Sequence, residues 1–200
     1  LYLSSKSYVE IERCHFLRYN YGIYLYNNSK NNVITSPTCS SSNYGIYLTS
    51  SSNNNTITTP TCNSNTNGIY LSSSSNNTIT TPTCNSNTSY GIYLYYSSNN
   101  TITTPTCNSN SYGIYLYFSS NNNTITTPTC NNNNYGIFVS SSSNNIANKY
   151  SGTGNSSADV YVAPGKHYGD YPCLKCQHFK TAGVNKCFYE YGTTERDTAN

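Results

Sequence analysis

The chain has 200 residues, of which 8% are charged, 35% are hydrophobic and 23 are tyrosine, and its formal net charge is +3. Lys30 and Lys149 are the only charged residues between Tyr19 and Ala158, so the sequence predicts no basic surface for nucleic acid. It contains no run of 18 apolar residues, so we predict no membrane span.

A unit of 22 to 23 residues repeats along most of the chain. A typical copy joins Gly-Ile-Tyr-Leu, a Ser/Asn run and Thr-Ile-Thr-Thr-Pro-Thr-Cys. A fixed period in the twenties is typical of a solenoid, in which each repeat forms one coil. Apolar and polar residues alternate within the repeat, which indicates strands rather than helices. We predict an all-β parallel β-helix of about seven coils, with copies starting near Gly22, Gly45, Gly68, Gly91, Gly113 and Gly136.

Residues 1–21 are predicted to form a divergent first coil. Cys14 follows Val9 by the same five residues that separate Ile34 from Cys39, so we expect Cys14 to begin the row of cysteines. This coil also carries charged side chains that the central coils lack. A charged terminal coil discourages edge-to-edge growth of the sheets at that end.

The core is predicted to consist of rows of like residues, because strands of successive coils pair about 4.8 Å apart. The stacked cysteines are either free thiols that act as small apolar residues or partly paired as disulfides, although their parallel Cβ vectors oppose disulfide geometry. Proline cannot donate to a ladder, so each Thr-Pro-Thr segment is expected to be a bend. With their equivalents in later coils, the predicted core residues are Ile23, Leu25, Ile34, Cys39, Cys62, Cys84, Cys107 and Cys130.

An aromatic stripe is predicted on the outer surface of the Gly-Ile-Tyr-Leu strands, because its residues alternate with the core isoleucine and leucine. Such rings can stack on sugars or on another subunit. Alternatively, they only stabilise their own sheet through cross-strand contacts. The predicted glycan or subunit contacts are Tyr24, Tyr47, Tyr70, Tyr93, Tyr115, Phe138, Tyr26, Tyr95 and Tyr117.

Pairs of threonines flank the second isoleucine of each central coil and would form a flat array of hydroxyl groups. The array resembles the ice-binding face of solenoid antifreeze proteins, and the alternative is ordinary β-propensity on a solvated strand. The pairs are Thr56/Thr58, Thr78/Thr80, Thr101/Thr103 and Thr124/Thr126.

Asn-X-Ser/Thr sequons recur along the chain and have two interpretations. They are either acceptors for N-linked glycans or ordinary turn residues of an asparagine-rich protein. They fall at Asn27, Asn54, Asn76, Asn87, Asn99, Asn122 and Asn155.

The repeat decays in its seventh copy, so we divide the chain into a β-helix, residues 1–158, and a C-terminal cap or small module, residues 159–200. The second part contains Cys173, Cys176, His178 and Cys187. These residues could form a disulfide staple, with one of the three cysteines left over, or a zinc site, although their spacing matches no common zinc finger. We expect no other cofactor.

The repeat, exemplified by YGIYLYYSSNNTITTPTCNSN, resembles the asparagine-rich repeats of NosD-like, carbohydrate-binding and sugar-hydrolase (CASH) β-helix proteins. The resemblance covers residues 1–148 and rests on Gly-Ile-Tyr-Leu, Ser-Ser-Asn-Asn and Asn-Thr-Ile-Thr. It implies a right-handed β-helix and an exported protein. The Thr-Thr-Pro-Thr-Cys segment departs from the family pattern, and the tail lies outside the match.

Carboxylates are absent from Cys14 to Ala158, so the central coils lack the paired acids that polysaccharide-cleaving enzymes use. Glu10 and Glu12 share one strand face of the first coil and are expected to be solvated surface. We therefore expect no catalytic residue and no enzymatic activity. The sequence favours an extracellular structural protein that self-assembles into a homo-oligomer, surface layer, sheath or filament, or acts as an adhesin. A module binding surface glycans, a remnant of a polysaccharide-active enzyme and an ice-binding protein are the alternatives.

Overall fold

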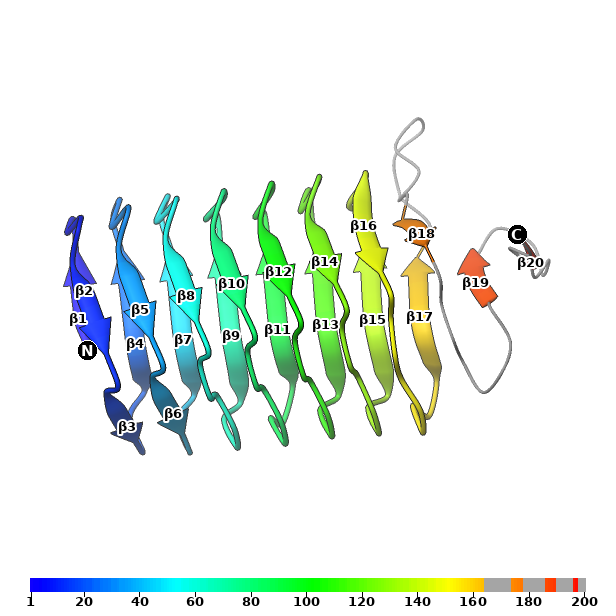
Figure 1. Ribbon diagram of the computed structural model, residues 1–200, viewed down its shortest axis with the longest axis horizontal. Helices are drawn as coiled ribbons and strands as arrows, with labels where there is room; N and C mark the ends of the chain where they lie inside the picture. The colour runs from blue at the N-terminus through cyan, green and yellow to red at the C-terminus, as the bar shows by residue number, and fades with distance from the viewer. Residues whose placement is uncertain (164–173, 178–185, 190–195, 198–200) are drawn as a thin grey trace.

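A computed structural model describes residues 1–163, 174–177, 186–189 and 196–197. The chain winds into a rod of stacked coils, each contributing short strands to the sides of the rod (Figure 1). The described residues contain no helix, and so none that could cross a membrane. The prediction of an all-β parallel solenoid of about seven coils is confirmed.

The first side of the rod, the tyrosine sheet, is formed by the Gly-Ile-Tyr-Leu segments. Its pairings are parallel, except between the last two strands. In spatial order its strands are β1 (Tyr2–Ser4), β4 (Tyr21–Tyr26), β7 (Tyr44–Thr49), β9 (Asn67–Ser72), β11 (Tyr90–Tyr95), β13 (Tyr112–Tyr117), β15 (Tyr135–Ser140), β17 (Ala158–Ala163), β19 (Lys186–Tyr189) and β20 (Arg196–Asp197).

The second side, the threonine sheet, is formed by the Thr-Ile-Thr segments. Its strands are β2 (Glu10–Glu12), β5 (Val33–Thr35), β8 (Thr56–Thr58), β10 (Thr78–Thr80), β12 (Thr101–Thr103), β14 (Thr124–Thr126), β16 (Asn145–Asn148) and β18 (Leu174–Gln177). The third side begins with β3 (His15–Leu17) and β6 (Thr38–Ser40) and continues as single bridges between the threonines that follow each proline.

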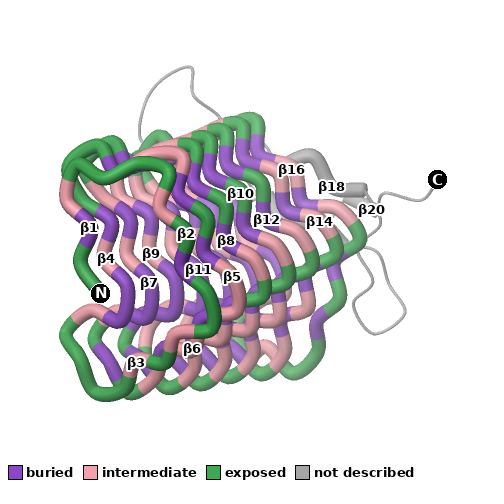
Figure 2. Tube along the Cα trace, turned by 60° about the vertical axis from the view of Figure 1, so that its left-hand side comes forward, coloured by how far each residue is buried: buried purple, intermediate pink, exposed green. Residues whose placement is uncertain are grey.

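Rows of identical residues fill the interior, and the buried stripes of Figure 2 follow them from coil to coil. Ile92 pairs with Ile69 on one side and Ile114 on the other, and the leucines two residues later do the same. All of the predicted core residues from Ile23 to Cys130 are fully buried. Burying one Ile or Leu side chain contributes roughly 1.5–3 kcal/mol, and each coil repeats that contribution.

The glycines allow neighbouring coils to approach closely. A Cβ on Gly91 would lie 2.5 Å from the carbonyl oxygen of Gly113 and 3.0 Å from the Cβ of Cys107. Gly91 and Ile92 are both buried although they are adjacent. The strand therefore breaks its alternation at the glycine, with two consecutive residues facing the core.

Two corners of the rod are held by buried asparagine ladders, defined by Asn32 to Asn145 and by Asn65 to Asn155 at one residue per coil. The Oδ1 atom of Asn100 accepts the backbone N–H of Asn77 at 2.9 Å, and Asn123 accepts that of Asn100 at 2.8 Å. Between described residues, the one buried side-chain polar atom without a hydrogen bond is Nδ2 of Asn145, at the end of the first ladder. The ladders satisfy turn amides that would otherwise be buried without partners.

The prediction that Cys14 begins the cysteine row is wrong. Ile11, not Val9, pairs with Ile34, and the same register places Phe16 beside Cys39. Cys14 is therefore two residues out of the row and is only partly buried. The spacing of five residues between Val9 and Cys14 gave a wrong alignment, because the first coil pairs with the second through Ile11 and Phe16.

The cysteine row ends against Tyr150. Ser151 pairs with Thr129, so Tyr150 takes the place of Pro128 and Gly152 takes the place of Cys130 in this coil. The Tyr150 hydroxyl donates a hydrogen bond to the carbonyl oxygen of Cys130 at 3.2 Å, and the ring is 3% exposed. The aromatic ring thus fills the space that a further cysteine would leave partly empty.

Candidate functional site: the tyrosine face

The outer surface of the tyrosine sheet carries an unbroken row of aromatic rings, which we call the axial row. Strand register places one ring in every coil. Neighbouring ring centroids are 4.6–5.2 Å apart along the whole row. The row consists of Tyr2, Tyr24, Tyr47, Tyr70, Tyr93, Tyr115, Phe138 and Tyr161.

A second row lies beside the axial row, and the sequence analysis missed it. If inward and outward residues alternated strictly along the strand, the tyrosine before each glycine would face the core. Because the glycine and the isoleucine after it both face inward, this tyrosine lies on the outer face instead. Tyr90 stacks on Tyr93 at 4.5 Å and on Tyr112 at 5.4 Å. The regular recurrence of Tyr before Gly was the available signal. This second row consists of Tyr21, Tyr44, Tyr90, Tyr112 and Tyr135, with Asn67 replacing a ring between the second and third.

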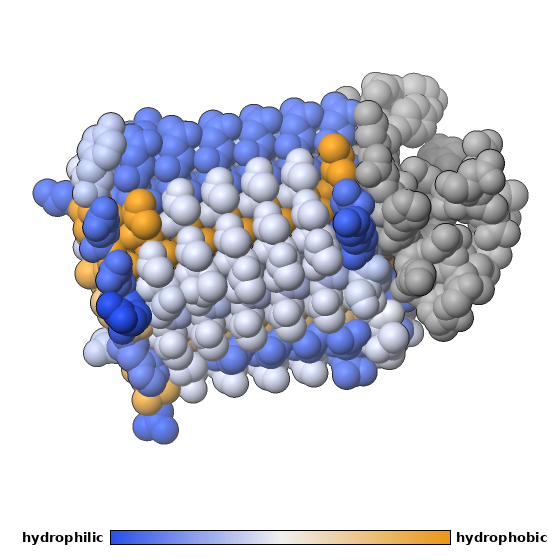
Figure 3. All heavy atoms as spheres, viewed as in Figure 1, coloured by the Kyte–Doolittle hydropathy of each residue, from blue (hydrophilic) through white to orange (hydrophobic). Residues whose placement is uncertain are grey.

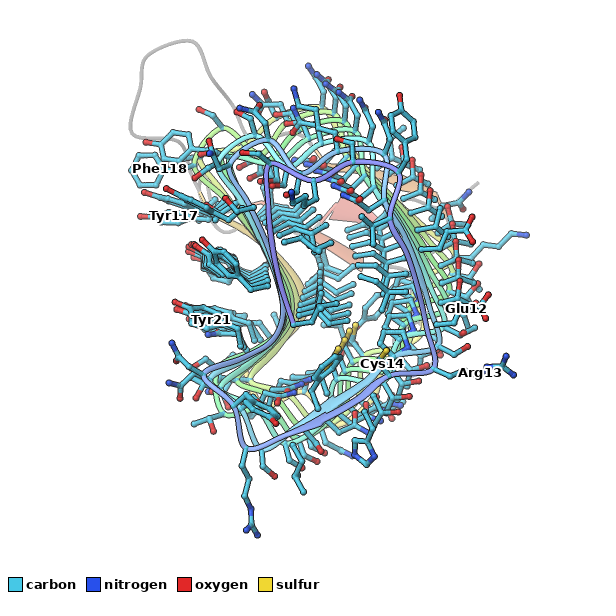
Figure 4. The ribbon with its side chains drawn as sticks, turned by 90° about the vertical axis from the view of Figure 1, so that its left-hand side faces the viewer. Glu12, Arg13, Cys14, Tyr21, Tyr117 and Phe118 are labelled. Carbon is cyan, nitrogen blue, oxygen red and sulfur yellow. The ribbon has the colours of Figure 1, made fainter. Side chains whose placement is uncertain are left out.

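From Tyr24 to Tyr115 the rings of the axial row are stacked face to face along the rod, whereas Phe138 stands at 89° to Tyr115. The interplanar angle is 7° between Tyr47 and Tyr70, 4° between Tyr70 and Tyr93, and 9° between Tyr93 and Tyr115. Viewed along the rod, the stacked rings project from the sheet with their oxygen atoms outermost (Figure 4). Neighbouring coils therefore cover the ring faces, and the surface offers ring edges and phenol hydroxyls. The axial row suits hydrogen bonding better than the ring stacking that the sequence analysis considered.

The phenols of Tyr24, Tyr70, Tyr93 and Tyr115 have raised pKa values and stay protonated at neutral pH. Burial, and secondly the neighbouring tyrosines, raise the pKa of Tyr24 and of Tyr70 from 10.0 to about 12. The same causes raise the pKa of Tyr93 and of Tyr115. Each hydroxyl can therefore donate one hydrogen bond and accept others.

A third set of rings lies at the edge of the sheet, where Tyr26, Tyr95 and Tyr117 point outward. Tyr95 and Tyr117 are 6.0 Å apart, whereas Thr49 and Ser72 separate Tyr26 from them. Residues 31–148 contain no charged side chain. Over the central coils the tyrosine face is therefore aromatic, rich in hydroxyl groups and uncharged.

The threonine sheet presents a different surface, drawn in Figure 3 as regular rows of threonines. Thr56, Thr78, Thr101 and Thr124 are in register, and Val33 and Ile146 occupy the ends of their row. The hydroxyl array expected from the sequence is thus formed. Ice binding by this array stays a prediction.

The cysteine row is interior and chemically shielded. Cys14, Cys39, Cys62, Cys84, Cys107 and Cys130 are free thiols in the structure. Burial, followed by contacts with the neighbouring thiols, raises the pKa of Cys84 well above its ordinary value of 9.0. Among the described residues, no group of three or more His, Cys, Asp or Glu side chains could hold a metal ion. The row therefore packs as small apolar side chains.

The predicted sequons fall into two structural classes. Asn87 is buried and donates from Nδ2 to Asn110 at 3.1 Å, and Nδ2 of Asn155 donates to Cys130 at 2.8 Å. These amides belong to the second asparagine ladder and hold turns of the rod, and glycan attachment at any of the sequons stays a prediction. The exposed sequons, all at turns with positive φ, are Asn27, Asn54, Asn76, Asn99 and Asn122.

The remaining predicted sites are at the two ends of the chain. Glu10 and Glu12 are exposed on β2, and Glu12 lies 3.5 Å from Arg13 in a solvent-exposed ion pair. Cys173 and His178 lie outside the described residues. Cys176 and Cys187 lie on β18 and β19, of which only the backbone is described. The disulfide or zinc site of the tail therefore stays a prediction.

Comparisons with known structures show where this fold occurs. The A-module of mannuronan C-5 epimerase AlgE4 from Azotobacter vinelandii superposes with a TM-score of 0.67 and 14% identity, covering 83% of this chain and 57% of that one. The periplasmic alginate epimerase AlgG superposes with a TM-score of 0.66 and 23% identity, covering 77% and 38%. The chain thus spans less than two thirds of either neighbour. No curated protein matches the sequence closely enough to count as a relative.

These neighbours contradict two expectations from the sequence. Both are enzymes that act on polysaccharides, so the prediction of a purely structural protein without enzymatic activity is wrong. That prediction rested on the absence of carboxylates from the central coils. This absence concerns only residues 14–158 and only chemistry that needs Asp or Glu. At this level of identity the likeness itself establishes the fold. A profile of the right-handed β-helix region matches residues 1–151, and the chain therefore belongs to the right-handed β-helix family.

Proposed function

We propose that this chain is the polysaccharide-binding β-helix of a polysaccharide-active protein that works outside the cytoplasm. The observation that carries the proposal is the axial row, an unbroken line of aromatic rings from Tyr2 to Tyr161. A polysaccharide is a linear repeat, and so is this row. One side of a long sugar chain can thus meet an equivalent set of hydroxyl groups in each coil.

Hydrogen bonding between hydroxyl groups is the interaction that this face offers. Protonated phenols match sugar hydroxyls because both groups donate and accept. Each neutral hydrogen bond contributes only about 0.5–1.5 kcal/mol, so useful affinity requires many of them in line. The axial row, with one phenol in every coil except that of Phe138, meets this requirement.

The names of the similar structures are consistent with a sugar ligand and with a location outside the cytoplasm. AlgE4 and AlgG are named for mannuronan and alginate, and AlgG is described as periplasmic. The resemblance of the repeat to NosD-like and CASH repeats supports the same proposal. We assign polysaccharide binding to residues 1–163.

The test removes phenol oxygens while keeping the rings. In a triple variant, Tyr70→Phe, Tyr93→Phe and Tyr115→Phe, the stacking should persist, because these side chains stack through their rings, with centroids 4.6 Å and 5.1 Å apart. We expect affinity for the best-binding polysaccharide to fall roughly tenfold, the sum of three lost hydrogen bonds. Affinity electrophoresis against a panel of neutral and acidic polysaccharides measures it.

The matched control changes the opposite surface. Thr78→Val and Thr101→Val remove hydroxyls from the threonine sheet, where Val33 is the native precedent. This variant should bind like the wild-type protein. If the two variants lose affinity equally, or if the wild-type protein binds no polysaccharide of the panel, the proposal is wrong.

A further inference from the structure

Two aromatic side chains stand on turns where the repeat otherwise places serine or asparagine. Tyr96 and Phe118 directly follow β11 and β13 and have φ values of 49° and 45°. At the same turn the other coils have Asn27, Ser50, Ser73 and Ser141, also with positive φ. Bulky residues are rare in this backbone region. Such outliers cluster at functional sites because they cost stability.

The fold gains little from these two rings. Tyr96 is 45% exposed and Phe118 is 38% exposed, among the most exposed aromatic side chains of the central coils. Neither contributes to the core, and coils with serine at the same turn keep the same register. An exposed ring held on an unfavourable backbone indicates selection for a contact with another molecule.

The orientation of these rings differs from that of the axial row. Tyr96 is inclined by 74° to Tyr95, and Phe118 is inclined by 75° to Tyr117. Tyr117 itself stacks on Tyr115 at 23° and therefore follows the rings of the axial row. The plane of Phe118 is therefore steeply inclined to the rings of the axial row, and Figure 4 shows Phe118 projecting from this corner.

The two rings form one platform. Their centroids are 5.5 Å apart and their planes differ by 31°, so a chain running along the rod would meet two ring faces in succession. Tyr95 contacts Tyr96 and Tyr117 contacts Phe118 in T-shaped pairs, with ring centroids 4.6 Å and 4.5 Å apart. We call Tyr95, Tyr96, Tyr117 and Phe118 the aromatic corner.

We propose that the aromatic corner is a subsite that stacks on consecutive sugar rings of an uncharged polysaccharide. The inference rests on the proposed function and adds the ligand class and the place of strongest contact. Ring faces that are not covered by neighbours suit the apolar faces of sugar rings. Residues 31–148 carry no charge, so a carboxylate-bearing polymer would find no cation here and would lose hydration without compensation.

The experiment replaces both rings by residues that the repeat itself uses at this turn. The double variant Tyr96→Ser, Phe118→Asn should fold with an unchanged or higher melting temperature, because the strained aromatic residues are gone. Its affinity for neutral glucan, mannan or xylan should fall roughly tenfold, the scale of two lost aromatic contacts. Tyr8→Asn, which removes an 81% exposed ring with a φ of 60° from the first coil, is the matched control and should retain its affinity.

A gain-of-function variant extends the test. Ser73→Tyr places a third ring at the same turn of the preceding coil and should raise affinity for long neutral oligosaccharides. If the wild-type protein binds polysaccharide and the double variant binds it equally well, the assignment of the aromatic corner as a sugar subsite is wrong, while the proposed function stands. Binding of alginate in preference to every neutral polymer would overturn the ligand class. Absence of any binding by the wild-type protein would remove both proposals.

Discussion

Asn100 illustrates how single side chains hold the coils together. Its Oδ1 accepts the backbone N–H and the side-chain amide of Asn77 at 2.9 Å and 3.2 Å, and its own amide donates to Asn123 at 3.1 Å. All three residues are buried. Removing one member therefore leaves a donor of the preceding coil without a partner.

We predict that Asn100→Ala lowers the free energy of unfolding by about 1–3 kcal/mol, the cost of an unsatisfied buried donor. Urea denaturation measures the loss. Asn99→Gly is the control, because Asn99 is exposed and has a φ of 58°, which glycine adopts readily. Equal destabilisation by the two variants would show that the ladder contributes nothing specific.

At the level of the sheet, the tyrosines are a titratable layer. Their raised pKa means that the folded state holds phenol protons more tightly than the unfolded chain. The stabilisation is complete below the unfolded pKa of 10.0 and is lost as the pH rises towards the folded pKa of about 12.

The expected result is a free energy of unfolding that begins to fall near pH 9, where the contribution of the buried Cys84 thiol is lost, and falls more steeply from pH 10 to 12. Thermal melts across this range, with tyrosinate absorbance recorded in parallel, measure it. Tyr24→Phe with Tyr70→Phe should make the fall shallower. A fall of the same steepness in this variant would assign the pH dependence to other groups.

The sheet also shows what could be predicted from the sequence and what could not. The core rows followed from the repeat, because stacked coils place like residues beside like, as Ile69, Ile92 and Ile114 do. The second row of rings, which contains Tyr90, could not be predicted from the repeat. The alternation of inward and outward residues fails at Gly91, where the backbone approaches the next coil closely. Ring orientation also depends on contacts between coils, which no pattern within one repeat encodes. Of the aromatic corner, the sequence predicted only Tyr95 and Tyr117, from their positions on the strands.

On the scale of the whole molecule, the rod has sides with different chemistry. The tyrosine face offers phenols and rings, and the threonine sheet offers an array of small hydroxyls. Within residues 1–163 the charged residues lie in the first two coils and at positions 149 and 159. The period of the repeat predicts the rod. It does not predict which side binds a ligand, because every side is equally regular.

A nuclear magnetic resonance titration with the best-binding neutral polysaccharide tests the central claim most directly, since it reports on both sides at once. Signals of the Tyr ring C–H groups and of the Thr methyl groups are followed together. We predict that ring signals of Tyr93, Tyr96 and Tyr115 shift or broaden while methyl signals of Thr78 and Thr101 stay in place. Changes confined to the threonines, or equal on both sides, would contradict polysaccharide binding by the tyrosine face.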